Sequence, residues 1–227
     1  MARCAVFDVD GTLVDSNYQH VLAWHRAFGR YDVVQPLWQI HRHLGMGGDK
    51  LVAAVAGEEV EQAHGDAIRD AWKREFDQLI DEVPVVPGAV DLLAAVKDAG
   101  ATLVLASSGK PEHVDQFLDL LGARDVADAW TSSEDVDDTK PDPDLLEVAI
   151  AKAGAADAVT FGDATWDALA AGRLELPAVL VRTGGFGADE LRAAGAVEVF
   201  DSLDDLQADL DRLLALAAPI RTQRSGA

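Results

Sequence analysis

Cysteine, long apolar runs and basic side chains are all scarce in this chain of 227 residues. Cys4 is the single cysteine, so no intramolecular disulfide can form and nothing points to an oxidising compartment. No apolar run approaches the roughly 20 residues that a membrane span needs. The N-terminus enters an apolar, strand-like run almost at once, which leaves no room for a signal peptide. We therefore expect a cytoplasmic protein that does not interact with membranes.

The charge balance is strongly acidic. The chain contains only 19 Lys and Arg residues but 40 Asp and Glu residues, and the formal net charge is -21. Such a field repels polyanions, so nucleic acid is not an expected partner, and a small anion has to be captured by local basic groups and helix N-termini. Apolar residues make up 49% of the chain, enough for one large α/β domain or a domain that carries a smaller inserted one.

An apolar, strand-like run at residues 5–7 leads directly into Asp8-Val9-Asp10-Gly11-Thr12. Alternate residues of a strand share a face, so Asp8 and Asp10 would both point off its carboxyl end, where open α/β sheets bind ligands. Two carboxylates this close require a cation or a shared proton, and an oxygen-rich site of this kind suits Mg²⁺. A strand followed by an ordinary Asp-Gly turn remains the alternative for this stretch alone.

The hydrophobic periodicity divides the chain into two parts. Between residues 16 and 83 the apolar residues recur at helical spacing, with helices expected to begin near residues 17, 36, 49 and 58 and no clear strand. After this helical unit, strands alternate with helices to the end of the chain. The further expected strands lie at residues 102–106, 129–131, 158–161, 178–181 and 197–200. This alternation predicts an α/β fold with a doubly wound parallel sheet and right-handed crossovers, into which the helical unit is inserted.

Three more strands of the predicted sheet end in polar motifs. The first motif is Ser107-Ser108-Gly109-Lys110, which leads into a helix whose N-terminus can bind an anion. The second is Thr139-Lys140-Pro141, in which the prolines around Lys140 restrict the direction of its side chain. The third, Gly162 to Asp167, brings two more carboxylates, Asp163 and Asp167, to a strand end. A helix cap, a solvated lysine and a helix-dipole partner are the ordinary alternatives for these residues.

The order of these four motifs, each at a strand-to-helix junction, resembles the haloacid dehalogenase-like hydrolase superfamily over nearly the whole chain. The helical unit looks like the four-helix cap of the subgroup that holds phosphoglycolate phosphatases and β-phosphoglucomutases. The resemblance implies a Rossmann-like core at residues 1–15 and 84–227 and a cap domain at residues 16–83. It also implies Mg²⁺ as the cofactor and phosphoryl transfer through an aspartyl phosphate.

The same resemblance implies a role for each motif. Asp8 would be the nucleophile and Asp10 the general acid and base, while Ser107 would hold the phosphoryl oxygens and Lys140 would neutralise charge on the phosphoryl group and on Asp8. The metal ligands implied are Asp8, Asp10 through its carbonyl, Asp163 and, as a support, Asp167. Because the dehalogenases of the superfamily lack the second aspartate, the presence of Asp10 favours a phosphate substrate.

The sequence defines the identity of the substrate less closely than the type of reaction. The expected substrate contacts are Ser108, Gly109, Lys110, His20, Gly47 and Lys50. Mutases of the family place an arginine in the loop at residues 45–50, where this chain has Gly47 and Gly48, although Lys50 or a neighbouring basic residue is a candidate substitute. We therefore predict a phosphoric monoester hydrolase for a small phosphorylated metabolite of the sugar phosphate or phosphoglycolate class, acting as a monomer or weak homodimer. A hexose-phosphate mutase is the alternative enzyme, and a non-catalytic phosphate-binding regulatory module is the alternative of another class.

Overall fold

Short apolar segments form the parallel sheet at the centre of the computed structural model, which describes residues 3–221. Its strand order is β3-β2-β1-β4-β5-β6, and all of these neighbours are parallel. The strands are β1 (Cys4–Phe7), β2 (Thr102–Ala106), β3 (Ala129–Thr131), β4 (Asp157–Gly162), β5 (Ala178–Val181) and β6 (Glu198–Phe200). The predicted α/β fold with a doubly wound parallel sheet is confirmed. Residues 1–2 and 222–227 of the predicted core lie outside the described residues.

One strand of the sheet was not predicted. The two residues of β7 (Ala218–Pro219) pair antiparallel with the start of β4, where Ala218 lies opposite Ala158. A segment this short that contains proline has no strand pattern of its own, because proline cannot donate to a ladder. Its pairing depends on where the preceding helices bring the chain.

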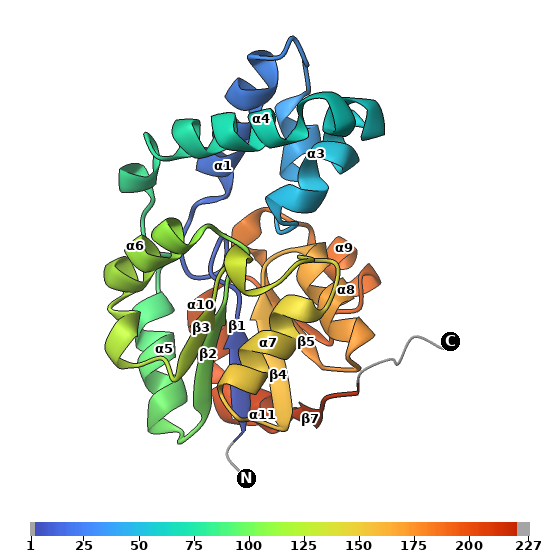
Figure 1. Cartoon of the computed structure of the whole chain (residues 1–227). Helices are drawn as coiled ribbons and strands as arrows, with labels where there is room; N and C mark the ends of the chain where they lie inside the picture. Colours follow the sequence, from blue (N-terminus) through green and yellow to red (C-terminus); the bar gives the residue numbers. More distant parts are fainter. Residues whose placement is uncertain (1–2, 222–227) are drawn as a thin grey trace.

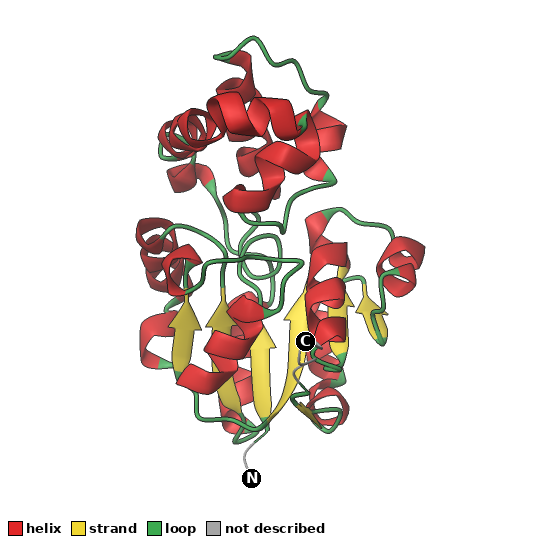
Figure 2. Cartoon of the chain, turned by 45° about the vertical axis from the view of Figure 1, so that its right-hand side comes forward, coloured by secondary structure: helices red, strands yellow, loops and turns green. Residues whose placement is uncertain are grey.

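The sheet is covered by helices on both faces (Figure 2). Alternate residues of β1 enter different clusters, with Ala5 and Phe7 in one and Cys4 and Val6 in the other. Burial on both faces explains why the central strands are continuous apolar runs. The helices of the core are α5 (Ala89–Asp98), α6 (Pro111–Leu121), α7 (Asp144–Lys152), α8 (Thr165–Arg173), α9 (Ala188–Ala193), α10 (Leu203–Ala208) and α11 (Leu210–Leu214). Single 3₁₀ turns lie at Ile80–Glu82, Ala123–Asp125, Ser133–Asp135 and Arg182–Gly184.

Four helices between β1 and α5 gather above the carboxyl ends of the strands (Figures 1 and 2). They are α1 (Asn17–Gly29), α2 (Leu37–His41), α3 (Gly48–Ala56) and α4 (Glu58–Phe76). Trp24 of α1 stacks on Trp72 of α4 with ring centroids 4.9 Å apart, so aromatic packing joins these helices. None of the helices within residues 3–221 has both the length and the apolar character needed to cross a membrane.

The two segments that connect the helical unit with the sheet run side by side. Asp15 N donates to the carbonyl of Pro84 at 2.9 Å, and Val86 N donates to the carbonyl of Leu13 at 2.9 Å. The chain thus leaves and re-enters the core at one place, which supports the proposed division into a core and an inserted cap at residues 16–83. We use the term cap for α1 to α4 below.

Candidate active site

The four polar motifs meet at the carboxyl edge of the sheet. Phe7 of β1 pairs with Leu105 of β2 on one side and with Phe161 of β4 on the other, so the residues after these three strands begin at the same level. Asp8 N also donates to the carbonyl of Phe161 at 2.8 Å, which holds the first motif beside the fourth. The site therefore follows from the parallel register of the sheet.

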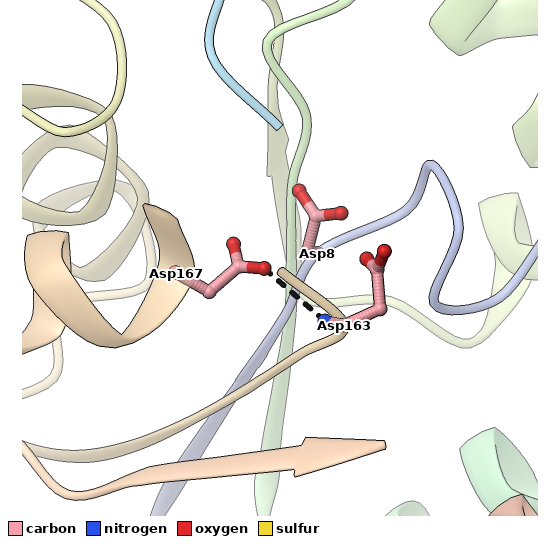
Figure 3. A group of neighbouring side chains, drawn as sticks. All are labelled: Asp8, Asp163 and Asp167. Atoms are coloured by element: carbon pink, nitrogen blue, oxygen red, sulfur yellow. Dashed lines mark hydrogen bonds between the residues drawn. The ribbon is translucent and has the colours of Figure 1, made fainter. Parts of the chain in front are cut away.

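Three buried carboxylates form the centre of this edge. Asp8, Asp163 and Asp167 each offer an oxygen atom, and these atoms lie within 4.8 Å of one another (Figure 3). Thr12 Oγ1 donates to Asp163 Oδ1 at 2.8 Å, and Asn17 Nδ2 donates to Asp163 Oδ2 at 3.1 Å. The cluster is an oxygen-only donor set, which fits a hard divalent cation such as Mg²⁺ and could hold one.

The backbone packs so closely around Asp163 that its carboxylate has little freedom. A β-carbon at Gly184 would lie 1.7 Å from Asp163 Oδ2, which only glycine avoids. This position therefore accepts no side chain, and the carboxylate stays fixed beside Asp8.

Lys140 supplies the positive charge of the cluster. Its side chain is 2% exposed, and its Nζ donates to Asp8 Oδ1 and lies 2.6 Å from Asp167 Oδ1. Burial by itself would lower the pKa of Lys140, but the negative charges of Asp167 and Asp8 outweigh burial and raise it. Lys140 is therefore a permanent cation between two carboxylates.

Asp167 uses both of its oxygen atoms within the protein. Its Oδ2 accepts a hydrogen bond from the backbone N–H of Asp163 at 3.1 Å (Figure 3). It also accepts one from the backbone N–H of Ala164 at 2.9 Å, at the start of α8. Its Oδ1 faces Lys140. Asp167 thus holds the loop of the fourth motif and Lys140 in place, and this arrangement suits a supporting role better than direct ligation of a metal.

One ammonium group does not balance three buried carboxylates. Burial raises the pKa of Asp8 to about 7, with Asp167 and Asp10 adding to the increase and Lys140 opposing it. Burial and the charges of Asp167 and Asp8 likewise raise the pKa of Asp163 well above its usual range. A bound cation would remove this repulsion, so the electrostatics agree with the donor set.

Asp10 has a different environment and its side chain lies outside the carboxylate cluster. Its Oδ1 accepts from Ser16 Oγ at 2.7 Å and faces His20 Nε2 at 3.0 Å, while its Oδ2 accepts from Ser107 Oγ at 3.2 Å. Burial would raise the pKa of Asp10, but the hydrogen bond and charge of His20, together with the two hydroxyl donors, lower it overall. Asp10 is therefore an ionised acceptor in this arrangement.

A cavity of about 50 Å³ opens between this site and the cap. It brings together the predicted residues Asp8, Asp10, His20, Gly47, Ser108 and Gly109. Trp24 and Trp72 complete the wall on the cap side, with Leu44 and Met46 beside them. The first and second motifs therefore face the cap across one small cavity.

Two of the predicted substrate contacts lie elsewhere. Lys110 lines a second, neighbouring cavity instead of the first. Lys50 lines neither of these cavities, because its ammonium group is bound by Asp138 and lies 3.4 Å from Asp142. The acidic loop before α7 binds the ammonium group of Lys50. Lys50 therefore does not line the first cavity, contrary to our expectation that it contacts the substrate.

The sequence motifs predict no role for Thr12, Asn17, Trp72 or Thr139. Thr12 and Asn17 hold Asp163. Thr12 is the last residue of the first motif and Asn17 begins α1 soon after it, and a polar residue at the start of a helix after such a motif is a usable signal. Trp72 lines both cavities and Thr139 bonds to Gly47, but their local sequence carries no sign of either contact. These contacts arise only when the cap and the core meet.

Known proteins resemble the chain in sequence and in structure. The model of the haloacid dehalogenase-like hydrolase family matches residues 2–174. Phosphoglycolate phosphatase of Caulobacter vibrioides is 28% identical over 221 residues, which cover 94% of this chain and 93% of that protein. Validoxylamine A 7'-phosphate phosphatase of Streptomyces hygroscopicus subsp. limoneus is 27% identical over 187 residues, covering 76% of this chain and 82% of that protein.

Among solved structures, a hydrolase from Pseudomonas syringae has a TM-score of 0.87 and 32% identity, and the match covers 92% of this chain and 98% of that one. The comparisons confirm the family and the class of enzyme that the four motifs predict. Because the family model matches most of the chain, this chain belongs to the haloacid dehalogenase-like hydrolases.

Proposed function

We propose that this protein is a Mg²⁺-dependent phosphatase that hydrolyses small phosphomonoesters through an aspartyl phosphate on Asp8. The observation that carries the proposal is the position of Asp8, whose carboxylate contacts Lys140 within the buried acidic cluster and also faces the first cavity. The relatives named as phosphatases support the same class of reaction.

Asp8 attacks the phosphorus atom, and the bond between phosphorus and the leaving oxygen breaks as the new bond to the carboxylate forms. Lys140 counters the negative charge of both reacting groups and keeps the carboxylate aligned. Mg²⁺, held by Asp8, Asp163 and the carbonyl of Asp10 with Asp167 in support, would supply further positive charge against the phosphoryl oxygens.

Asp10 moves the protons. It gives a proton to the leaving alcohol and then takes one from the water that attacks the aspartyl phosphate. Its lowered pKa keeps the carboxylate ionised, which is the form that accepts a proton in the second of these steps. For the first step Asp10 has to carry a proton, and His20 Nε2, which lies 3.0 Å from Asp10 Oδ1, is close enough to exchange one with it.

The second motif binds the phosphoryl oxygens. Ser107 Oγ donates to Asp10 and accepts from Gly109 N at 3.0 Å, and Ser108 and Gly109 line the first cavity at the start of α6. Hydroxyl and amide donors at the N-terminus of an 11-residue helix favour an anion at this position.

The cap side of the first cavity favours a phosphatase over a mutase. A mutase must retain a bisphosphate, which needs a strong cationic contact far from the nucleophile. Within the described part of the chain, no lysine or arginine lines this cavity. Its cap side consists of aromatic, apolar and glycine residues together with Asn17 and His20, and His20 is already paired with Asp10. A substrate with one phosphate needs no such contact.

A panel of phosphorylated metabolites tests the proposal by release of inorganic phosphate, with Mg²⁺ and with a chelator. We expect turnover of at least one monoester that the chelator abolishes. Phosphorus NMR on glucose 1-phosphate primed with a bisphosphate distinguishes a phosphatase from a mutase. Conversion to the 6-phosphate faster than phosphate release would contradict a phosphatase. No turnover of any ester would favour a non-catalytic phosphate-binding module.

A further inference from the structure

A second cavity of about 340 Å³ adjoins the first, and the two share Gly48, Trp72 and Ser108 in their walls. The first cavity, at about 50 Å³, is well below the roughly 150 Å³ that holds one benzene molecule. If the proposed function is correct, on which this inference rests, the phosphoryl group fills the first cavity and the remainder of the substrate extends into the second.

The wall of the second cavity is predominantly acidic. Asp49, Asp66, Glu134 and Asp137 contribute four carboxylates, and Arg69 and Lys110 contribute two cations. Within residues 3–221, Glu134 and Asp137 form no ion pair or side-chain hydrogen bond, so these two exposed residues bring uncompensated negative charge to the wall of the cavity. An anionic group in this cavity would meet net repulsion.

Arg69 does not reverse this balance. Its guanidinium donates to both oxygens of Glu61, at 2.9 and 2.8 Å, and to Asp66 Oδ1 at 2.8 Å. It also donates to the carbonyl of Gly48 at 3.2 Å. With Arg69 bound in this way, Lys110 is the remaining cation of the wall, against the two unpaired carboxylates of Glu134 and Asp137.

Two polar groups in the wall point to a ligand that carries hydroxyl groups. Trp72 is 8% exposed, and its indole N–H has no hydrogen-bond partner among the described residues. Ser133, which lines the second cavity, likewise has a buried hydroxyl without a partner in this part of the chain. Buried polar groups of this kind normally find a partner. A small movement of either side chain would bring its polar atom to the cavity surface, where a hydroxyl group of a ligand close to the Trp72 ring would satisfy it.

We propose that the second cavity receives the leaving group of the substrate and selects a hydroxyl-bearing group that is uncharged or cationic, such as a polyol or an amino polyol. A leaving group with a carboxylate or a second phosphate is disfavoured by the unpaired acids. The substrate class is therefore a monophosphate of a polyol or amino polyol, not phosphoglycolate and not a bisphosphate.

Three hexose-sized esters test the charge preference at constant Mg²⁺ and ionic strength. Glucosamine 6-phosphate has a cationic leaving group, glucose 6-phosphate a neutral one and 6-phosphogluconate an anionic one. We expect kcat/KM to be lower for 6-phosphogluconate than for the other two by about tenfold or more, the scale of an unfavourable contact between partly solvated charges. p-Nitrophenyl phosphate serves as a general substrate for the hydrolytic activity.

A pair of double variants locates the effect. Replacing both unpaired acids, Glu134→Gln with Asp137→Asn, should bring the ratio of kcat/KM between glucosamine 6-phosphate and 6-phosphogluconate close to one. The matched control, Asp91→Asn with Asp98→Asn, removes the same charge from the exposed face of α5 and should preserve the ratio.

The results distinguish failure of the charge preference from failure of the proposed phosphatase activity. Equal or faster hydrolysis of 6-phosphogluconate by the native protein overturns the charge preference while the proposed phosphatase stands. The charge preference is also overturned if the ratio of kcat/KM values falls as much in the control variant as in the cavity variant. The net negative charge of the whole protein, and not the two acids of the cavity, would then cause the preference. No phosphate release from any ester, p-nitrophenyl phosphate included, overturns the proposed function and this inference together.

Discussion

The hydroxyl of Thr139 accepts a hydrogen bond from the backbone N–H of Gly47 at 2.9 Å and donates to Asp49. Gly47 and Asp49 belong to the start of α3 in the cap, whereas Thr139 immediately precedes the buried Lys140 of the core. One hydroxyl thus joins the loop that carries the cation of the site to the loop of the cap that closes the first cavity. The position of the cap and the position of Lys140 are coupled through this contact.

Gly47→Ala should disturb this contact. A β-carbon at residue 47 would lie 2.2 Å from Thr139 Oγ1, so either α3 or the loop with Lys140 has to move. We expect kcat/KM to fall by about tenfold, since small displacements of positioning groups are costly. Steady-state kinetics on the best substrate measure this loss. Gly29→Ala is the matched control, because Gly29 lies in α1 with open space around it, and an equal effect of both substitutions would rule out the contact as the cause.

Asp8→Asn should abolish turnover and preserve the fold. The amide cannot attack phosphorus, and loss of an activated nucleophile typically lowers kcat by about 10⁴-fold or more. The substitution also removes one of three mutually repelling carboxylates, so circular dichroism should show a native spectrum. Phosphate release close to that of the native protein would disprove the aspartyl phosphate.

Mg²⁺ should stabilise the folded protein through the carboxylate cluster. A ligand at 100 times its Kd that binds only the native state adds about 2.7 kcal/mol, and for a domain of this size each kcal/mol raises Tm by about 2–4 °C. Thermal unfolding with and without Mg²⁺ measures the shift, which Asp163→Asn should reduce because it removes one carboxylate of the cluster. Asp91→Asn, on an exposed face of α5, should leave the shift unchanged. An undiminished shift in Asp163→Asn would locate the metal elsewhere.

His113 of α6 should make stability depend on pH. Its Nε2 lies 2.7 Å from Asp77 Oδ1 at the end of α4, and burial lowers its pKa, opposed by the bond to Asp77 and assisted by the charge of His20. The unfolded chain therefore binds this proton at a higher pH than the native protein. The contribution to stability is complete above the ordinary histidine pKa of about 6.5 and declines as pH falls below it.

Urea unfolding at pH 7.5 and pH 5.5 tests this prediction by comparing His113→Gln with the native protein. The glutamine cannot take up a proton, so the free energy of unfolding should fall less between the two pH values. His25→Gln, at an exposed position of α1, is the control and should keep the native difference. If His113→Gln lost as much stability as the native protein over this range, other groups would carry the pH dependence.

The sequence by itself determined the sheet and the meeting point of the four motifs. Apolar runs of three to six residues between helices predict a parallel sheet, and parallel strands deliver the residues after them to one edge. The proximity of Asp8 and Asp163 therefore needed no knowledge of side-chain packing. Both side chains are short and directly follow a strand, so their destinations follow from the topology, whereas Lys140 reaches them from a loop that follows β3.

Only the tertiary structure decided the contacts between the cap and the core. Lys50 and Asp138 are 88 residues apart, and nothing local to Lys50 shows that an acidic loop of the core captures its ammonium group. The same holds for Trp72, which reaches both cavities from near the C-terminal end of α4. A long side chain on a helix can reach many neighbours, so its partner depends on how the two parts of the chain dock, and that arrangement is encoded in contacts between residues far apart in the sequence.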